Sequence, residues 1–279
     1  MTTCKYAVVG NPISHSKSPQ IHAMFAEQTS QDIHYSAILA DIDGFGKVAD
    51  KFFAKGGQGL NVTVPFKRDA FDYASRTTVR ATAAKAVNTL ILEQDGSITG
   101  DNTDGIGLAN DILSNLGWEI KAKKLLVLGA GGAVQGILEP LLDLQPQHIV
   151  IANRSVDRAL RLAKQFSESG YLIGCALDML EGQEFDVIIN GTSTSMYGDH
   201  LSLPASLFRG KPNYCYDLMY GAEATPFMQD AKNHGAITAD GLGMLVEQAA
   251  ESFSIWRGVR PDTKPIIGLI RESLERYCR

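Results

Sequence analysis

Strand-like and helix-like segments alternate along this chain, and that alternation limits the folds it can adopt. Short apolar runs rich in β-branched residues are typical of buried strands. They occur at residues 6–9, 34–39, 60–64, 87–92, 125–128, 148–152, 186–190 and 214–217. Helix-like stretches lie between most of them, including residues 19–28, 105–116, 134–142 and 156–166. Because helical crossovers join parallel strands, we predict an α/β fold built on largely parallel sheets.

Length and local pattern predict two domains. A chain of 279 residues is long for one domain, since a typical domain has roughly 150 residues. The best boundary lies near residues 102–104, where SITGDNTDGIG turns from strand-like to helix-like and Asp, Asn and Thr are natural N-caps. A further helix is predicted to begin near residue 242 and to end before Gly258. Its apolar stripe consists of Leu242, Leu245, Val246, Ala249, Ala250, Phe253 and Trp256.

Charge and composition exclude several functional classes. The formal net charge of −5 argues against general binding to phosphate backbones, so we expect no nucleic-acid partner. Apolar residues make up 44% of the chain, which is enough for ordinary cores. No segment approaches the roughly 18 consecutive apolar residues of a membrane span, and the first residues do not build a signal peptide. We therefore expect a soluble protein with no membrane partner.

The cysteines indicate a reducing compartment. Cys4, Cys175, Cys215 and Cys278 are widely scattered, without a C-x-x-C pair or histidines at metal-ligand spacing. We interpret them as reduced thiols of a cytoplasmic protein and expect no metal site.

The segment KLLVLGAGGAVQG, residues 124–136, carries the clearest cofactor signal. A strand leads into a turn, a helical pattern follows, and this is the context that a dinucleotide fingerprint requires. The turn consists of Gly129, Ala130, Gly131, Gly132 and Ala133. Glycines let backbone N–H groups at a helix N-terminus approach a pyrophosphate. A glycine-rich turn alone is often structural, but the full strand, turn, helix and strand context favours cofactor binding.

The end of the next strand indicates which nicotinamide cofactor binds. An NAD-binding fold usually carries an acidic residue there, about 20 residues beyond the glycines. This chain has Asn153, Arg154 and Ser155 instead, with Arg158 one turn further on. A guanidinium suits the 2′-phosphate of NADP, which a carboxylate would repel. We therefore predict NADP(H), with a solvated basic helix start as the structural alternative.

A serine-rich loop, GNPISHSKSP at residues 10–19, follows the first strand. It offers Ser14, Ser16 and Ser18 before a helix that Pro19 is suited to open. In one interpretation Ser18 caps the helix and the other serines form turns. In the other, the serines bind a substrate carboxylate or hydroxyls. Spacing does not decide between them.

The segment LNVTVPFK, residues 60–67, alternates polar and apolar residues. We predict a strand that ends at Pro65, because proline cannot donate to the ladder. Its valines would pack on one face, Asn61 and Thr63 would turn toward a cleft, and the bend would carry Lys67 to a substrate. The structural alternative is a surface lysine after a strand.

Three more polar residues stand at the edges of apolar segments, namely Asn88, Asp104 and Gln248. Taken alone, Asn88 could be a hydrogen-bonded core amide and Gln248 could bond to backbone. Asp104 alone could be a first-turn carboxylate that interacts with the helix dipole.

Taken in order, these segments resemble the shikimate dehydrogenase family of the aromatic pathway. The matching motifs are GNPISHSKSP, NVTVPFK, AVNT, GDNTDG, GAGGA, NRS, YD-x-x-Y and ADGLGMLVEQA. Any one of them is modest, but eight in order over essentially the whole chain are highly specific. The resemblance implies an α/β substrate domain at residues 1–103, completed by residues 241–279. An NADP-binding Rossmann domain would occupy residues 104–240, with the active site in a cleft between the two, and we expect a monomer or a homodimer.

The resemblance also implies roles for individual residues. Lys67 and Asp104 would be the catalytic pair. Ser16 and Ser18 would bind the substrate carboxylate, and the further substrate contacts would come from Thr63, Asn88, Asp104, Tyr220 and Gln248. Beside the glycine turn and the residues that follow the next strand, Leu218, Gly241 and Met244 would flank the nicotinamide.

A few positions depart from the family pattern. The loop NGTSTSMYGD, residues 190–199, has Gly191 where alanine is common and contains an unusual Ser-Met-Tyr sequence. Val134 stands at the usual third glycine position, and Ser155 stands where threonine is usual. These changes could weaken cofactor affinity, and we expect no change in the cofactor's identity.

The implied reaction is reversible hydride transfer between NADPH and the ketone of 3-dehydroshikimate, which gives shikimate and NADP+. Negative charge grows on the oxygen as hydride arrives, so Lys67 would supply both charge and proton while an ionised Asp104 holds its ammonium. Two alternatives stay open. One is a quinate/shikimate dehydrogenase that uses NAD, which the lack of an acid after Arg154 argues against. The other is a non-catalytic NADPH-binding relative, which would not need the Lys67 and Asp104 pair.

Overall fold

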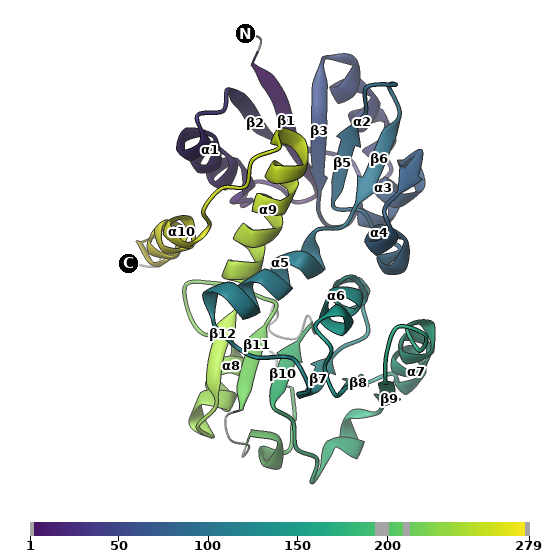
Figure 1. Cartoon of the computed structure of the whole chain (residues 1–279), viewed down its shortest axis with the longest axis vertical. Coiled ribbons are helices and arrows are strands. Elements are labelled where there is room, and N and C mark those ends of the chain that lie inside the picture. Colours follow the sequence, from purple (N-terminus) through teal and green to yellow (C-terminus); the bar gives the residue numbers. More distant parts are fainter. Residues whose placement is uncertain (1–2, 193–200, 209–212, 277–279) are drawn as a thin grey trace. The chain divides into compact units, whose positions relative to one another are not determined.

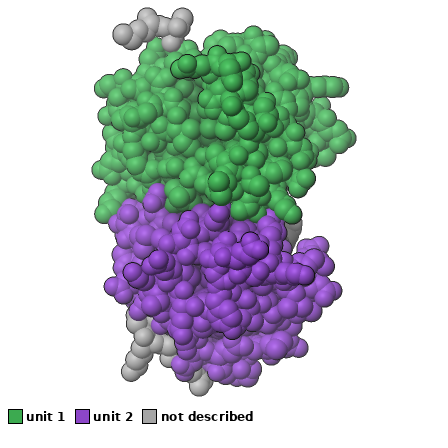
Figure 2. Space-filling model, turned by 45° about the vertical axis from the view of Figure 1, so that its right-hand side comes forward, with its two compact units in different colours: residues 1–107, 245–270 green, residues 108–244, 271–279 purple. Residues whose placement is uncertain are grey.

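The computed structural model describes residues 3–192, 201–208 and 213–276. The chain divides into two compact units, coloured in Figure 2: unit 1 is residues 1–107 and 245–270, and unit 2 is residues 108–244 and 271–279. The boundaries fall within α5 (Asp104–Asn110), α9 (Leu242–Arg257) and α10 (Lys264–Arg276). The expected boundaries, after residues 103 and 240, lie a few residues earlier, and the expected domain assignment and cleft stay predictions.

Unit 1 is built on a mixed six-stranded sheet in the order β2-β1-β3-β5-β6-β4. The strands are β1 (Cys4–Gly10), β2 (Ile33–Leu39), β3 (Gly57–Val62), β4 (Arg76–Thr77), β5 (Thr89–Leu92) and β6 (Ile98–Asp101). β1 is parallel to both β2 and β3, and β4 is parallel to β6. β5 is antiparallel to its neighbours β3 and β6. Because β1 and β3 are parallel neighbours, their carboxyl ends lie side by side, and the loops that follow them are brought together.

Successive side chains of a strand point to opposite faces of the sheet, so a strand can present apolar residues to both faces. Helices cover both faces of this sheet. Under α2 (Phe45–Ala54) and α3 (Lys67–Tyr73) lies a core that includes Val9, Leu60 and Val62 (Figure 1). On the other face, the ring of Tyr6 stacks on Trp256 of α9 with centroids 4.7 Å apart. There α1 (Ser18–Thr29) also packs against α9. The short α4 (Val79–Ala84) begins after Thr78, whose hydroxyl accepts the amide N–H of the third helical residue.

Unit 2 is built on an all-parallel six-stranded sheet in the order β12-β11-β10-β7-β8-β9. The strands are β7 (Lys124–Leu128), β8 (His148–Ala152), β9 (Leu172–Cys175), β10 (Val187–Asn190), β11 (Tyr214–Asp217) and β12 (Ile237–Asp240). The strand order reverses between β7 and β10, which is where open α/β sheets bind ligands. The predicted α/β fold and its parallel-rich sheets are confirmed.

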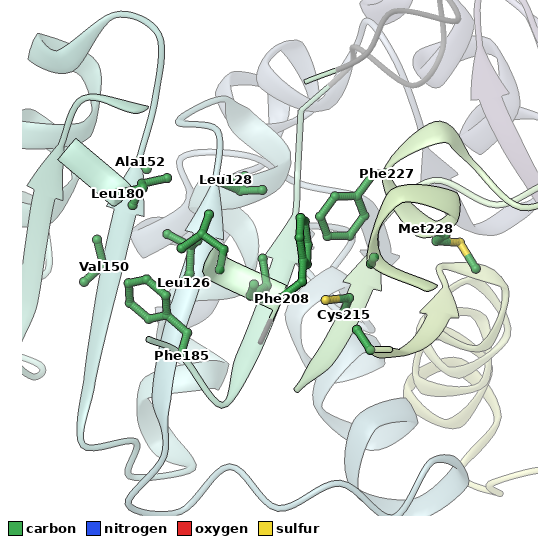
Figure 3. Close-up of a cluster of buried hydrophobic side chains, with 14 of the residues drawn as sticks. Leu126, Leu128, Val150, Ala152, Leu180, Phe185, Phe208, Cys215, Phe227 and Met228 are labelled. Atoms are coloured by element: carbon green, nitrogen blue, oxygen red, sulfur yellow. The ribbon is translucent and has the colours of Figure 1, made fainter. Parts of the chain in front are cut away.

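The helices of unit 2 include α6 (Gly132–Asp143), α7 (Val156–Gln165) and α8 (Pro226–Asn233). Shorter turns lie at Asp111–Asn115, which is π-helical, and at Leu177–Leu180 and Ala205–Phe208, which are 3-10 helical. One core lies between the sheet and α8, where Leu126, Val150 and Cys215 meet Phe208 and Phe227 (Figure 3). Burial of these apolar side chains stabilises the sheet, and its strand β7 leads into the glycine turn.

Three expected elements differ from those observed. The strand predicted to reach Pro65 is wrong at its end: β3 stops at Val62, and Val64 is 67% exposed instead of packed. The Thr63 N–H still donates to the carbonyl of Val9 at 2.9 Å. The Phe66 N–H donates to the carbonyl of Thr63 at 3.0 Å, so a turn replaces the last residues of the predicted strand. The strand predicted at residues 87–92 begins at residue 89. The helix predicted at residues 105–116 is α5 followed by the π-helical turn.

Further expectations concern compartment and partners. Cys4, Cys175 and Cys215 are not joined in disulfides, and Cys278 lies outside the described residues. In the described ranges no helix is long and apolar enough to cross a membrane. Nor do three or more His, Cys, Asp or Glu side chains in those ranges gather in an arrangement suited to a metal ion.

Candidate active site

An ion pair between Lys67 and Asp104 is the centre of the candidate site in unit 1. Lys67 is the first residue of α3, and buried Phe66 anchors the chain just before it. Asp104 is the first residue of α5. The lysine Nζ lies 2.6 Å from the aspartate Oδ2, with side-chain exposures of 30% and 7% respectively. The two residues predicted as the catalytic pair are therefore in direct contact, and the lysine keeps access to solvent.

Asn88 joins this pair to other predicted substrate residues. It is 3% exposed and lies just before β5. Its Nδ2 is 2.9 Å from Oδ1 of Asp104 and 3.0 Å from Oε1 of Gln248, which α9 contributes. Its Oδ1 accepts the backbone N–H of Thr103 at 2.9 Å. The amide is thus fixed on both sides, and Gln248 bonds to this side chain, not merely to backbone.

The loop GNPISHSKSP positions two half-buried serines at the start of α1. Ser18 is the first residue of that helix, and Lys17 occupies the N-cap without a side-chain hydrogen bond. The interpretation of Ser18 as the N-cap is therefore wrong. The backbone N–H of Ser18 donates to Oγ of Ser16 at 3.3 Å. Burial raises the pKa of the nearby Tyr35 well above its usual value, and a hydrogen bond with the Ser18 side chain acts against that rise.

Asn61 and Thr63 have different surroundings. Asn61 is enclosed by polar partners: its Oδ1 accepts from the Tyr35 hydroxyl at 2.7 Å, and its Nδ2 donates to Oγ of Ser252 at 3.0 Å. Thr63 lies half-buried beside the end of β1, where a methyl group added to Gly10 would lie 2.5 Å from its Cγ2. Sequence reasoning missed Tyr35 and Ser252, because neither stands in a motif and each is found only through its partner.

The glycine turn of unit 2 has the geometry expected of a dinucleotide site. Gly129 has a φ of +103°, which favours glycine, and its N–H donates to the carbonyl of Ala152 at 2.8 Å. After the half-buried Ala130, Gly131 is the N-cap of α6. Gly131, Gly132 and Ala133 are exposed, and a Cβ added at either glycine meets no atom within 4 Å. The N-terminus of a 12-residue helix is therefore open to an anion.

The predicted 2′-phosphate residues lie at the carboxyl end of β8. Asn153 donates its Nδ2 to the carbonyl of Ser155 at 3.0 Å, which shapes the turn. Ser155 is the N-cap of α7, with no side-chain cap bond. Arg154 and Arg158 are exposed, and within the described parts of the chain neither forms an ion pair. Two guanidinium groups are thus available to a phosphate at this strand end.

The residues predicted beside the nicotinamide also lie in unit 2. Leu218 follows β11 and donates its N–H to the carbonyl of Asn190 at 2.9 Å. A Cβ added to Gly241 would lie 2.2 Å from the carbonyl oxygen of Leu218, so only glycine allows this approach. Met244 is in the first turn of α9. Burial, and then the charge of Asp240, raises the pKa of Tyr220, the remaining predicted substrate residue.

Two departures from the family pattern form a single packing contact. Gly191 follows β10, and a methyl group added to it would lie 2.4 Å from Cγ2 of the buried Val134. The valine therefore occupies room that an alanine at residue 191 would need. The rest of the predicted nicotinamide-side loop, residues 193–199, lies outside the described residues.

Comparison with known proteins places this geometry in a family. Residues 8–90 match the shikimate dehydrogenase substrate-binding domain, residues 108–202 match shikimate/quinate 5-dehydrogenase, and residues 241–271 match the shikimate 5-dehydrogenase C-terminal domain. A shikimate dehydrogenase (NADP(+)) of Cellvibrio japonicus is 55% identical over 96% of this chain and 97% of its own length.

Two solved structures are similar over nearly the full chain. An Ael1 enzyme from Pseudomonas putida has a TM-score of 0.92 and 45% identity, covering 96% of this chain and 98% of its own. Shikimate 5-dehydrogenase from Thermus thermophilus, in complex with NADP(H) and shikimate, has a TM-score of 0.86 and 29% identity, covering 98% and 100%.

Proposed function

The chain belongs to the shikimate dehydrogenase family and is an NADP-dependent oxidoreductase acting on a CH–OH group, and we propose that Lys67 and Asp104 carry its chemistry. The substrate pair is 3-dehydroshikimate and shikimate, and the physiological direction is reduction of the ketone for aromatic amino-acid biosynthesis. The observation that carries this proposal is the 2.6 Å contact between the Lys67 ammonium and the Asp104 carboxylate.

Lys67 acts as the proton donor to the substrate oxygen during reduction and as the base during oxidation. Charge that develops on the oxygen is stabilised by a cation already in place, so little reorganisation is needed in the transition state. Asp104 orients the ammonium through Oδ2, and Asn88 orients Asp104 through Oδ1. A partly exposed lysine beside a nearly buried carboxylate suits a group that exchanges protons with solvent between turnovers.

Polar side chains around this pair bind the rest of the substrate. Ser16 and Ser18 offer hydroxyl donors to the carboxylate, where the loop has few basic residues besides Lys17. Asn88 donates to Gln248 at 3.0 Å, and both side chains are proposed neighbours of the ring hydroxyls. Thr63 and Tyr220 complete the proposed substrate set.

The residues of unit 2 fit NADP. The exposed N-terminus of α6 suits the pyrophosphate, and Arg154 and Arg158 suit the 2′-phosphate. Asn153 and Ser155 shape the adenosine end, and Leu218, Gly241 and Met244 hold the nicotinamide end. When bound, the nicotinamide supplies or accepts the hydride. In this proposal residues 104–240 form the cofactor domain, and residues 1–103 with 241–279 form the substrate domain.

The remaining features of the proposal concern location and assembly. Cys4, Cys175 and Cys215 form no disulfide, which is in keeping with a cytoplasmic protein, and the net charge of −5 argues against a nucleic-acid partner. We propose a monomer or homodimer, which sedimentation at several protein concentrations would distinguish.

The proposed substrate and cofactor are tested by initial rates with shikimate and with quinate, each with NADP+ and with NAD+. We expect the highest kcat/KM for shikimate with NADP+. Equal or greater activity on quinate with NAD+ would instead assign the chain to the quinate/shikimate type, and no turnover in any combination would favour a non-catalytic relative.

A further inference from the structure

A buried carboxylate lies against the first turn of α9, next to the proposed nicotinamide residue Met244. Asp111 begins the π-helical turn after α5 and is 3% exposed. The hydroxyl of the fully buried Tyr216, in β11, donates to its Oδ2 at 2.7 Å. Asn115 donates its Nδ2 to the other oxygen, Oδ1, at 3.0 Å. A carboxylate is costly to bury unless hydrogen bonds satisfy it, and these two bonds hold the Asp111 carboxylate in a fixed position.

Gly243 allows the carboxylate to approach the helix. A Cβ added there would lie 1.9 Å from Oδ1 and 2.3 Å from Oδ2 of Asp111, so any larger residue would displace the carboxylate or the helix. Next in the chain, Met244 bonds to the Tyr216 phenol oxygen through its backbone N–H. Burial raises the pKa of Tyr216 well above its usual value, and the Asp111 charge adds to the rise, so the phenol stays a neutral donor. The first turn of α9 is thus bonded to β11 through one hydroxyl group.

This connection lies within the proposed nicotinamide end of unit 2. Gly241, which precedes the turn, packs on the carbonyl of Leu218, and its N–H donates to Met219 at 3.0 Å. Met244 is the other proposed neighbour of the nicotinamide. The separation between Gly241 and Met244 is therefore set by the first turn of α9, which Asp111 and Tyr216 hold.

We propose that Asp111 and Tyr216 are positioning residues for the nicotinamide, which act by fixing the first turn of α9 through Gly243 and the backbone of Met244. The inference rests on the proposed function, because it takes Gly241 and Met244 as the neighbours of the ring. Neither Asp111 nor Tyr216 is required to touch the cofactor. Their effect should appear in hydride transfer and not in recognition of the adenosine end.

The test is Tyr216→Phe, which removes only the hydroxyl, compared with Tyr214→Phe in the same strand. Reduction of 3-dehydroshikimate is followed with NADPH and with NADPH deuterated at the transferred position, and binding of 2′,5′-ADP is measured by calorimetry. In Tyr216→Phe we expect kcat to fall by about 10- to 100-fold, because a small misplacement of reacting groups slows a reaction by that order. The deuterium isotope effect on kcat should rise, while affinity for 2′,5′-ADP and the KM for 3-dehydroshikimate stay unchanged. Tyr214→Phe should leave all four values unchanged.

Asp111→Asn provides the second variant, because an amide oxygen can still accept the Tyr216 proton. It should retain more activity than Tyr216→Phe and show a smaller rise in the isotope effect. All assays are made well below each variant's melting temperature. A Tyr216→Phe enzyme that only melts earlier, with the isotope effect and kcat of the wild type, would overturn the proposal. Failure of the proposed function is recognised separately, by a wild-type protein that does not reduce 3-dehydroshikimate with NADPH.

Discussion

The Nζ of Lys67 lies 2.6 Å from Oδ2 of Asp104, although the two residues belong to separate helices, α3 and α5, and both occupy the first position of their helix. Helix starts are fixed by the strands and turns before them, so the pair is held by backbone on both sides. The second carboxylate oxygen is bonded to Asn88 at 2.9 Å, which limits rotation of Asp104. This arrangement supports the account of Lys67 as an acid/base group whose position is preset.

The first prediction concerns cofactor choice and Arg154, which is exposed at the end of β8. Arg154→Ala should raise the KM for NADP+ strongly and that for NAD+ little. Only NADP+ loses a charge-assisted contact, worth about 1.5–3 kcal/mol. Steady-state kinetics with both cofactors checks this, with Arg161→Ala, a change at another exposed arginine, as the control. Equal losses for NADP+ and NAD+ would remove Arg154 from the 2′-phosphate site.

The second prediction concerns the serine loop. Ser16→Ala and Ser18→Ala should each weaken shikimate binding and leave NADP+ binding nearly intact, since both hydroxyls lie in unit 1 at the start of α1. Ser14→Ala, an exposed change in the same loop, is the control. Calorimetry and thermal melting separate the two interpretations. A lower melting temperature with unchanged shikimate affinity would make that serine structural.

The third prediction concerns Gly191 and Val134. Gly191→Ala should destabilise the protein by about 1–3 kcal/mol through overpacking, because the new methyl group would lie 2.4 Å from Cγ2 of Val134. Val134→Ala should relieve that clash, so the double variant should lose less stability than the sum of the single variants. Urea unfolding of all four proteins measures this coupling. Gly46→Ala, where an added methyl meets no atom within 4 Å, is the control. Additive effects would mean that the two departures are independent.

The fourth prediction concerns His22, which is fully buried and stacked on Tyr35 with ring centroids 4.0 Å apart. Burial lowers its pKa to about 3, whereas the unfolded chain protonates it near the usual value of about 6.5. Between these values the unfolded state binds the extra proton, so His22 lowers stability as the pH falls below about 6.5, by about 1.4 kcal/mol per pH unit. In His22→Phe this contribution should be absent. Unfolding free energies at pH 7.5 and 5.5 test it, and an identical pH dependence in the two proteins would contradict the assignment.

In unit 2 the sequence predicts the inner strands better than the edge strands. β8 and β11 were predicted with the observed bounds, because strands of a parallel sheet are buried on both faces and form continuous apolar runs. β9 and β12 at the sheet edges were not predicted, since their partly exposed side chains leave no such run. The predicted end of β3 differs from the observed one because the strand stops at Val62, before Pro65. The π-helical turn at Asp111 has no local sequence signature.

For the candidate site, residue types were predictable and their connections were not. The motifs located Lys67, Asn88, Asp104 and Gln248, but spacing alone could not show that Asn88 would link the other residues. Such contacts join segments far apart in the chain, and only the fold brings them together. Tyr35, Tyr216 and Asp111 were missed for the same reason, because buried polar residues are recognised by their partners.

The central claim, that Lys67 is the acid/base group, is tested most directly by Lys67→Met. The variant keeps an unbranched chain of similar length and removes the ammonium that lies 2.6 Å from Asp104. The measurement is kcat together with NADPH affinity on one folded sample, with Arg68→Met, the exposed neighbour, as the control. The account predicts a fall in kcat of about 10²- to 10⁴-fold, the range for a lost proton-transfer group, with NADPH affinity barely altered. Near-normal turnover in Lys67→Met would contradict it.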